Sequence, residues 1–224
     1  MQFFASELFE AKKNGEIILA LEDSSYLGFV YTKDVVSKNE KLHNIVAKFL
    51  DTSNFTCKDF ADVLHVNSLL FEDEYVEIIK SKLKHSFEKF NAGFCFGNDI
   101  SRKMYCNKKI NNLFNVIGLN RVKLESALLP NGYDIFTYSP EVAMKMAGKI
   151  LFDALDSGCA FLIVNDIRTF TFFDSYQKKI AKTISRDLSL PILTLAQVVL
   201  MAIGQTDKKV LGFNKHDIKP TLLS

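Results

Sequence analysis

Residues 139–164, SPEVAMKMAGKILFDALDSGCAFLIV, decide the fold class, because they predict a helix followed directly by a buried strand. Ser139-Pro140-Glu141 supplies a capping residue, a first-turn proline and a first-turn acid, which together are typical of a helix start. Ser157-Gly158 is typical of a helix end. Between these signals the apolar residues keep helical spacing: Ala143, Met146, Ala147, Ile150, Leu151, Ala154 and Leu155.

The strand that follows this helix is an unbroken apolar run over residues 160–164, as expected for a parallel strand buried on both faces. A helical pattern over 170–185, a strand over 192–195 and a helix over 196–203 continue the same rhythm, and residues 135–138 predict a short strand before it. Strands that alternate with helices indicate a parallel sheet covered by helices. We therefore predict an α/β class, with a Rossmann-like parallel-sheet module over residues 116–224.

The first half of the chain, residues 1–115, predicts a mixed α+β module whose function the sequence does not reveal. Its elements are expected to be helices over 3–13, 40–50 and 72–90, a short helix over 57–64, and a hairpin of strands 16–22 and 26–31 that turns at Asp23-Ser24-Ser25. His65, after the short helix, is expected to be a capping or surface residue.

The stretch from Asn91 to Gly132 is rich in glycine and asparagine, which break regular elements, and it predicts the junction between the two modules. Phe94 and Phe96, on either side of Cys95, suit a strand at the edge of a sheet. Residues 113–117 form a further short apolar piece that the pattern does not assign.

The composition excludes several classes of protein. The net charge is only +2, with basic and acidic residues interleaved, so no footprint for nucleic acid is present. The longest apolar stretch, residues 191–204, is shorter than a membrane span, and residues 1–15 lack the pattern of a signal peptide. The four cysteines have no close spacing, which favours a reduced, cytoplasmic protein with small buried thiols. We expect no cofactor.

The first place to look for a site is the loop after the central strand, because ligands of open α/β sheets bind at the carboxyl ends of the strands. Asn165, Asp166, Arg168 and Thr169 place a carboxylate, a guanidinium and two neutral polar groups there. The alternative is that Asp166 caps a helix beginning near Thr169 while Arg168 is solvated. His216 is a weaker candidate for a base, its alternative being a residue of the terminal tail.

Motifs of common enzymes are missing from the sequence. No Gly-x-Gly-x-x-Gly and no Gly-x-x-x-x-Gly-Lys-Ser/Thr follows a predicted strand, so a conventional nucleotide site is not predicted. A Gly-x-Ser-x-Gly nucleophile elbow is also missing.

Short features of the second half nevertheless follow one another in a recognisable order. They are Ser139-Pro140-Glu141, Ser157-Gly158-Cys159-Ala160, Leu162-Ile163-Val164, Asp166-Ile167-Arg168-Thr169, residues 174–177, Pro191-Ile192-Leu193, Ala196-Gln197-Val198, and a tail that places His216 four residues after Gly212. Their order and spacing resemble those of the cysteine-rich CCG domain of heterodisulfide reductase B subunits, over about residues 139–220. The resemblance implies a Rossmann-like domain that, in the family, binds iron–sulfur clusters through cysteines.

The sequence departs from that family at the cluster ligands. The positions of a Cys-x-x-Cys pair are occupied by Asp166 and Thr169, and no Cys-Cys-Gly occurs in the chain. Thiolates are the ligands that hold iron–sulfur clusters, and Asp and Thr are poor replacements. The resemblance therefore implies a degenerate domain without family-style cluster binding.

Two hypotheses follow from the sequence. The first is a non-catalytic accessory or interaction protein, which would bind another subunit or itself and neither nucleic acid nor membrane. The alternative is a small-molecule-binding protein or oxidoreductase subunit with Asp166 as an acid/base or anchor and Arg168 receiving an anion. A cluster shared across a dimer through Cys95 or Cys106 is a third, more remote interpretation.

Overall fold

The computed structural model describes residues 1–52, 54–96 and 107–221 of the chain. The chain divides into two compact units, Met1–Leu69 and Leu70–Ser224. Each unit has its own hydrophobic core of buried side chains. No helix within the described residues is long and apolar enough to cross a membrane.

The boundary between the units lies after Leu69, whereas the sequence placed it after residue 115. The difference arises because β3 (Asn91–Cys95) pairs in parallel with β5 (Phe161–Val164), the strand predicted from the decisive stretch. The glycine- and asparagine-rich segment interpreted as a junction thus begins with a strand at the centre of the second unit's sheet, and Cys95 does not lie on an edge strand.

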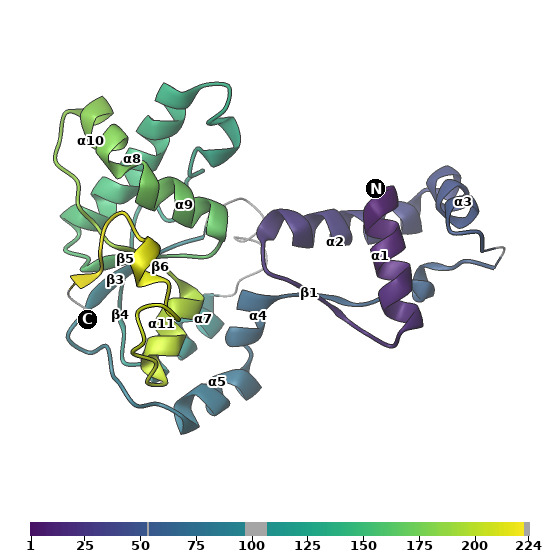
Figure 1. The fold of residues 1–224 in the computed structure, drawn as a ribbon, viewed down its shortest axis with the longest axis horizontal. Coiled ribbons are helices and arrows are strands. Elements are labelled where there is room, and N and C mark those ends of the chain that lie inside the picture. The colour runs from purple at the N-terminus through teal and green to yellow at the C-terminus, as the bar shows by residue number, and fades with distance from the viewer. Residues whose placement is uncertain (53, 97–106, 222–224) are drawn as a thin grey trace. The chain divides into compact units, whose positions relative to one another are not determined.

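The second unit is built on a four-stranded parallel sheet in the order β4-β3-β5-β6 (Figure 1). β5 is buried along its whole length, as its unbroken apolar run predicts. In the register of the sheet, Cys95 lies beside Val164, and Val164 lies beside Thr194, so the carboxyl ends of three strands share one edge. The two outer strands are β4 (Asn120–Val122) and β6 (Ile192–Thr194).

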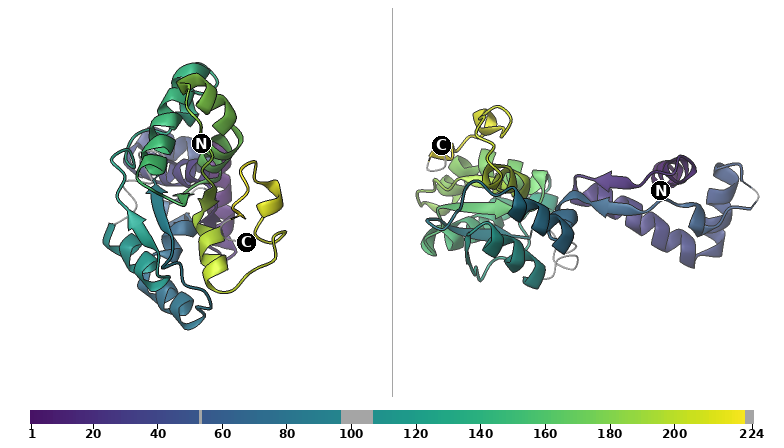
Figure 2. Two further views of the ribbon diagram at one scale, coloured as in Figure 1. Left: turned by 90° about the vertical axis from the view of Figure 1, so that its left-hand side faces the viewer. Right: turned by 90° about the horizontal axis from the view of Figure 1, so that it is seen from below.

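Helices cover this sheet and confirm the predicted α/β class with a Rossmann-like module. The helix of residues 139–164, α8, packs on β3, β5 and α10, and it begins at Pro140 as the sequence predicts. The segment after α11 lies at the surface of the unit (Figure 2). The helices are α5 (Asp73–Ser81), α7 (Asn107–Val116), α8 (Pro140–Asp156), α9 (Ile167–Ser175), α10 (Gln177–Ile184) and α11 (Leu195–Ala202), with short 3₁₀ turns at Tyr133–Ile135 and Phe213–Lys215.

Three predictions for the second unit were wrong in detail. Residues 135–138 form no strand, because the chain makes a 3₁₀ turn at Tyr133–Ile135 directly before α8. The helix expected over 72–90 ends at Ser81, since the backbone N–H groups of residues 84 and 85 donate to the carbonyl of Ala202 instead of to their own helix. The helix expected over 170–185 is two helices that meet at Tyr176.

The first unit consists of helices around a two-stranded parallel sheet. β1 pairs with β2, and Ile18 lies beside Val63 in the register. Leu8, Phe29, Val36 and other apolar side chains of the helices form its core. Its elements are α1 (Gln2–Lys13), β1 (Ile18–Ala20), α2 (Asp23–Lys38), α3 (Glu40–Phe49), a 3₁₀ turn at Cys57–Asp59, β2 (Val63–His65) and α4 (Val66–Leu70), whose last residue belongs to the second unit.

The predicted hairpin of the first unit was wrong. Asp23-Ser24-Ser25 begins α2 rather than a turn, and the hydroxyl of Ser24 donates to the carboxylate of Glu22 at 2.9 Å. Small polar residues favour helix starts as much as turns, so the local signal was ambiguous. Phe29 and Val36 are both buried and lie seven residues, or about two helical turns, apart. This helical spacing was not recognised because residues 26–31 alone also suit a strand.

Candidate functional site

The loop predicted as the site leaves the carboxyl end of β5 and leads into α9. Asn165, Asp166 and Thr169 are buried there, whereas Arg168 is exposed. The structure therefore brings three of the four predicted residues together inside the protein and places the fourth at its surface.

Asp166 is the N-cap of α9, which begins at Ile167, two residues earlier than expected. Its Oδ1 accepts hydrogen bonds from the backbone N–H groups of Arg168 at 3.0 Å and of Thr169 at 2.9 Å. Its Oδ2 accepts the hydroxyl proton of Thr169 at 2.6 Å. These bonds satisfy donors that the first turn of any helix leaves without an intrahelical partner.

Asn131 extends this cap into tertiary structure. Its side-chain amide donates to Thr169 Oγ1 at 2.6 Å, and its Oδ1 accepts from the backbone N–H of Tyr133 at 2.9 Å. The Thr169 hydroxyl thus donates to one residue and accepts from another. Asn131 was not identified from the sequence, because it lies 38 residues from its partner and carries no local motif.

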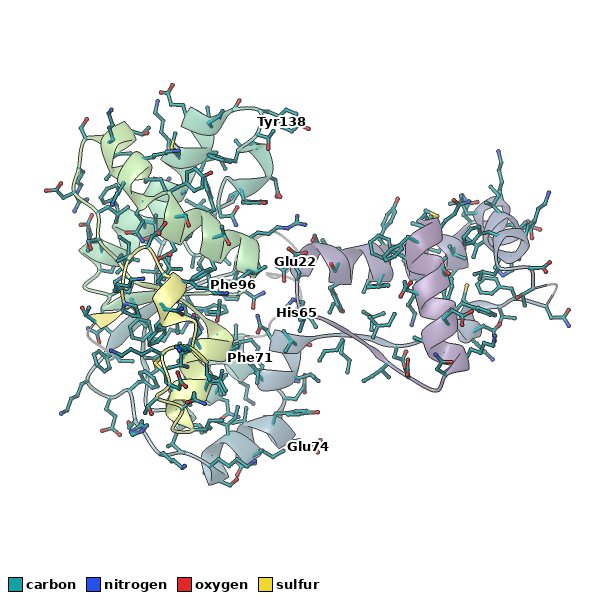
Figure 3. The ribbon with its side chains drawn as sticks, in the orientation of Figure 1. Glu22, His65, Phe71, Glu74, Phe96 and Tyr138 are labelled. Atoms are coloured by element: carbon teal, nitrogen blue, oxygen red, sulfur yellow. The ribbon has the colours of Figure 1, made fainter. Side chains whose placement is uncertain are left out.

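Arg168 stacks over an aromatic ring, with its guanidinium carbon 5.8 Å from the centre of the Tyr133 ring. Tyr133 in turn contacts Phe172 edge to face, so the ring is held by the core beneath it. This arrangement keeps the cation at the surface. Tyr138, also at the surface, is 87% exposed (Figure 3).

His216 lies in a second polar cluster, formed with Asp174 of α9 and Gln197 of α11. The ring is 2% exposed and contacts Phe170 and Phe213, so this residue of the terminal tail is enclosed by the core. Its Nδ1 lies 4.0 Å from Asp174 Oδ1.

The hydrogen bonds of Gln197 fix the tautomer of this histidine. Gln197 Oε1 accepts from the backbone N–H of Thr194 at 2.8 Å, so the other end of the amide is its NH₂ group. That group donates to the carbonyl of Leu211 at 2.7 Å and faces His216 Nε2 at 2.9 Å. Nε2 must therefore be the acceptor, and the proton of the neutral ring is on Nδ1, on the side of Asp174.

Burial has opposite effects on the two ionisable groups of this cluster. Removal from water lowers the pKa of His216 below its ordinary value, with Asp174 acting in the other direction. It raises the pKa of the Asp174 carboxyl, although the backbone N–H groups of Asp217 and Ile218 donate to that carboxyl and oppose the shift. A neutral histidine can act as a base only where a substrate proton can reach it, and here both groups are enclosed.

His65 of the first unit was predicted as a capping or surface residue. It is completely buried at the end of β2 (Figure 3), so the surface alternative was wrong, but it directly precedes α4 and bonds to that helix's first turn as a capping residue does. Its Nδ1 accepts from the backbone N–H of Asn67 at 3.2 Å, and its Nε2 lies 3.1 Å from Asp23 Oδ1. No local pattern marks this pair in the sequence, because its members lie far apart along the chain and meet only when β1 and β2 pair.

The cysteines within the described residues do not assemble a metal site. Cys95 ends β3, whereas Cys159 precedes β5 at the opposite edge of the sheet; the register separates them by about five residues of strand, roughly 16 Å. Burial raises the pKa of Cys159 to about 11. Cys57 belongs to the first unit, and Cys106 lies outside the described residues. Across the described ranges, no three or more His, Cys, Asp or Glu side chains come together in a way that could hold a metal ion.

The iron–sulfur cluster implied by the family resemblance does not fit the residues at the Cys-x-x-Cys positions. Asp166 and Thr169 offer hard oxygen atoms in place of thiolates, and those oxygens already bind one another and the backbone. No chemical step at this loop is therefore assigned to a cluster.

Comparisons with known proteins agree with this architecture. Residues 133–217 match the family model of the HdrB-like C-terminal domain, which confirms the relation to heterodisulfide reductase B subunits for this segment. A crystal structure of a hypothetical protein from Helicobacter pylori matches 97% of the chain with a TM-score of 0.74 and 22% identity, a likeness of fold. The chain spans 41% of the length of that protein. No curated protein matches the sequence.

Proposed function

We propose that this chain is a non-catalytic accessory or interaction protein, related to heterodisulfide reductase B subunits, whose HdrB-like domain binds no iron–sulfur cluster. The observation that carries the proposal is the bonding of Asp166 and Thr169. Asp166 caps the first turn of α9 and accepts the hydroxyl of Thr169, and Thr169 in turn bonds to Asn131, so the positions of a cluster-ligand pair serve the fold instead. In this proposal the protein is cytoplasmic and binds another subunit or a second copy of itself.

The experiment is to produce the chain with iron and sulfide supplied, purify it without oxygen, and measure iron, acid-labile sulfide and visible absorbance. We expect a colourless protein with iron far below one atom per chain. A variant with Asp166→Cys and Thr169→Cys is a matched comparison for the ligand positions. Iron and sulfide stoichiometric with the wild-type protein would contradict the proposal.

Substitution of the chain's own cysteines would identify the ligands of any iron that was found. If stoichiometric iron appeared and was lost in Cys95→Ser or Cys106→Ser, a cluster shared between two chains would be the better account. Light scattering of the iron-loaded protein would then show a dimer. The non-catalytic part of the proposal is tested separately, because a protein that oxidises reduced methyl viologen when a disulfide is added would be an enzyme.

The alternative function, a small-molecule site at the loop 165–169, is favoured by one observation, the exposed guanidinium of Arg168 above the Tyr133 ring. It gives an anion a cation at the carboxyl edge of the sheet, where such folds bind ligands. Asp166 would have to give up its cap to act as an acid or base. Phosphate or acetate that raises the melting temperature of the wild type, and not of Arg168→Ala, would support this alternative.

A further inference from the structure

The second unit contains a cavity of about 300 Å³ that the loop 165–169 does not line. It lies between the segment before β3, the carboxyl end of α11 and the loop that follows α11. Because Phe90 directly precedes β3, the cavity is at the amino-terminal end of the sheet, opposite the predicted site. Its lining residues are His85, Ser86, Phe87, Phe90, Met201, Gln205, Thr206, Lys208, Leu211 and Phe213.

Aromatic and apolar side chains form the inner wall of this cavity. Phe87, Met201 and Phe213 are buried members of the core, and Phe90 packs partly against it. The rings of Phe87 and Phe90 lie 6.2 Å apart, and each contacts Phe161 of β5. The wall is therefore fixed by the central strand and presents ring surfaces, which suits a flat apolar ligand.

Among the described residues that line the cavity, the polar ones are donors or neutral groups, and none is acidic. The Gln205 side-chain oxygen accepts from the backbone N–H of Asp207 at 2.9 Å, so the other end of this amide is its NH₂ donor. Lys208 is exposed, and its ammonium makes no hydrogen bond or ion pair with any residue that the structure describes. The carboxylate of the adjacent Asp207 does not line the cavity and accepts from the backbone N–H of Lys209. A cation at the rim of an apolar cavity favours a ligand that carries a negative charge.

The loop that carries these groups is held by its own hydrogen bonds. Asp207 accepts from the backbone N–H of Lys209 at 2.7 Å through its side chain and from that of Leu211 at 2.9 Å through its carbonyl. The N–H of Phe213 donates to the carbonyl of Lys208 at 2.9 Å. On the other wall, the N–H of His85 donates to the carbonyl of Ala202 at 3.0 Å. A cavity with fixed walls loses little conformational entropy when a ligand enters.

We propose that this cavity binds a small aromatic carboxylate, with its ring against Phe87 and Phe90 and its carboxylate at Lys208. The proposal does not depend on the accessory function or on the absence of a cluster, since it concerns other residues at the opposite edge of the sheet. The ring burial provides affinity, and the ammonium selects the anion over a neutral compound of the same shape.

The test uses 2-naphthoate as the probe, because the chain contains no tryptophan and the fluorescence of the naphthalene ring is free of that background. We expect saturable binding that Lys208→Ala weakens by about fivefold, in line with the loss of one partly exposed charge-assisted contact. Lys209→Ala is the matched control, since it removes the same charge from the neighbouring residue, which does not line the cavity. The neutral 2-naphthamide is expected to bind more weakly and equally to both variants.

A second measurement locates the probe on the full chain. Backbone amide chemical shifts in nuclear magnetic resonance spectra are expected to change over residues 85–90 and 205–213 and to stay constant over 165–169. Equal affinities of Lys208→Ala and Lys209→Ala for 2-naphthoate, no saturable binding at all, or shift changes confined to other residues would overturn the proposal.

Discussion

Asp166→Ala tests directly whether the residue at the cluster-ligand position stabilises the fold. The substitution removes the acceptor of two backbone N–H groups and of the Thr169 hydroxyl. Loss of an N-cap costs about 1 kcal/mol. Thr169 is completely buried, so the lost acceptor of its hydroxyl adds about 1–2 kcal/mol. The free energy of unfolding should therefore fall by roughly 2–3 kcal/mol.

Urea unfolding followed by circular dichroism measures this change, and thermal unfolding should show a decrease of about 6 °C in the melting temperature. Asp187→Ala is the control, because Asp187 is exposed and a surface substitution of this kind should change stability by less than about 0.5 kcal/mol. Asp166→Asn keeps one carbonyl acceptor and should fall between the two. If Asp166→Ala unfolded at the same urea concentration as Asp187→Ala, the capping argument would be refuted.

Three further predictions concern buried groups of the second unit. The pKa of His216 is lowered in the folded protein, so the unfolded chain binds this proton more readily and the free energy of unfolding should fall as the pH drops through about 6.5. His216→Gln should reduce the fall in the free energy of unfolding that urea unfolding measures between about pH 7.5 and 5.5. An equal fall in the wild type and the variant would contradict the assignment to His216. Cys159, with a pKa of about 11, should be unreactive in the folded protein. Cys159→Ser should therefore leave the rate of thiol modification of the folded protein at about pH 8 unchanged, and should lower by one the number of thiols that react in urea. Slower modification of the folded variant than of the folded wild type would show that Cys159 is accessible. Gly132 has a φ of +88°, and an added Cβ would lie 2.6 Å from the carbonyl oxygen of Ala143. Gly132→Ala should therefore lower the free energy of unfolding by more than about 1 kcal/mol, measured by thermal unfolding. An unchanged melting temperature would show that the turn can adjust.

The sequence predicted the second unit best where local and tertiary preferences agree. The helix start at Ser139-Pro140-Glu141 and the apolar run of β5 are both strong local signals, and the sheet uses them as predicted. The same reasoning failed for residues 82–90. Their apolar spacing continues that of α5, but the backbone bonds to the carbonyl of Ala202 draw them away from the helix. Such a partner, far away along the chain, leaves no periodic signal in the segment itself.

The residues of the candidate site also differ in whether their partners are close along the chain. The capping role of Asp166 involves only four consecutive residues, so it could be predicted from the sequence as an alternative. The cluster of Asp174, Gln197 and His216 joins three elements, and only the fold shows that the histidine is enclosed. The pair of Asp23 and His65 depends on strand pairing in the same way. Local chemistry is thus predictable from the sequence, whereas the partners of a polar side chain in the core are not.

The spacing of Asp166 and Thr169 explains how positions that correspond to a Cys-x-x-Cys pair can form a helix cap. Residues three apart at the start of a helix are the N-cap and the third helical residue, whose backbone N–H group the cap side chain accepts. The same N–H groups and the positive end of the helix dipole stabilise a thiolate placed there. A carboxylate at position 166 meets the same donors, and a hydroxyl at position 169 supplies one more. The carboxylate of Asp166 therefore compensates the start of α9 as a thiolate there would, whereas neither Asp166 nor Thr169 offers a soft sulfur atom.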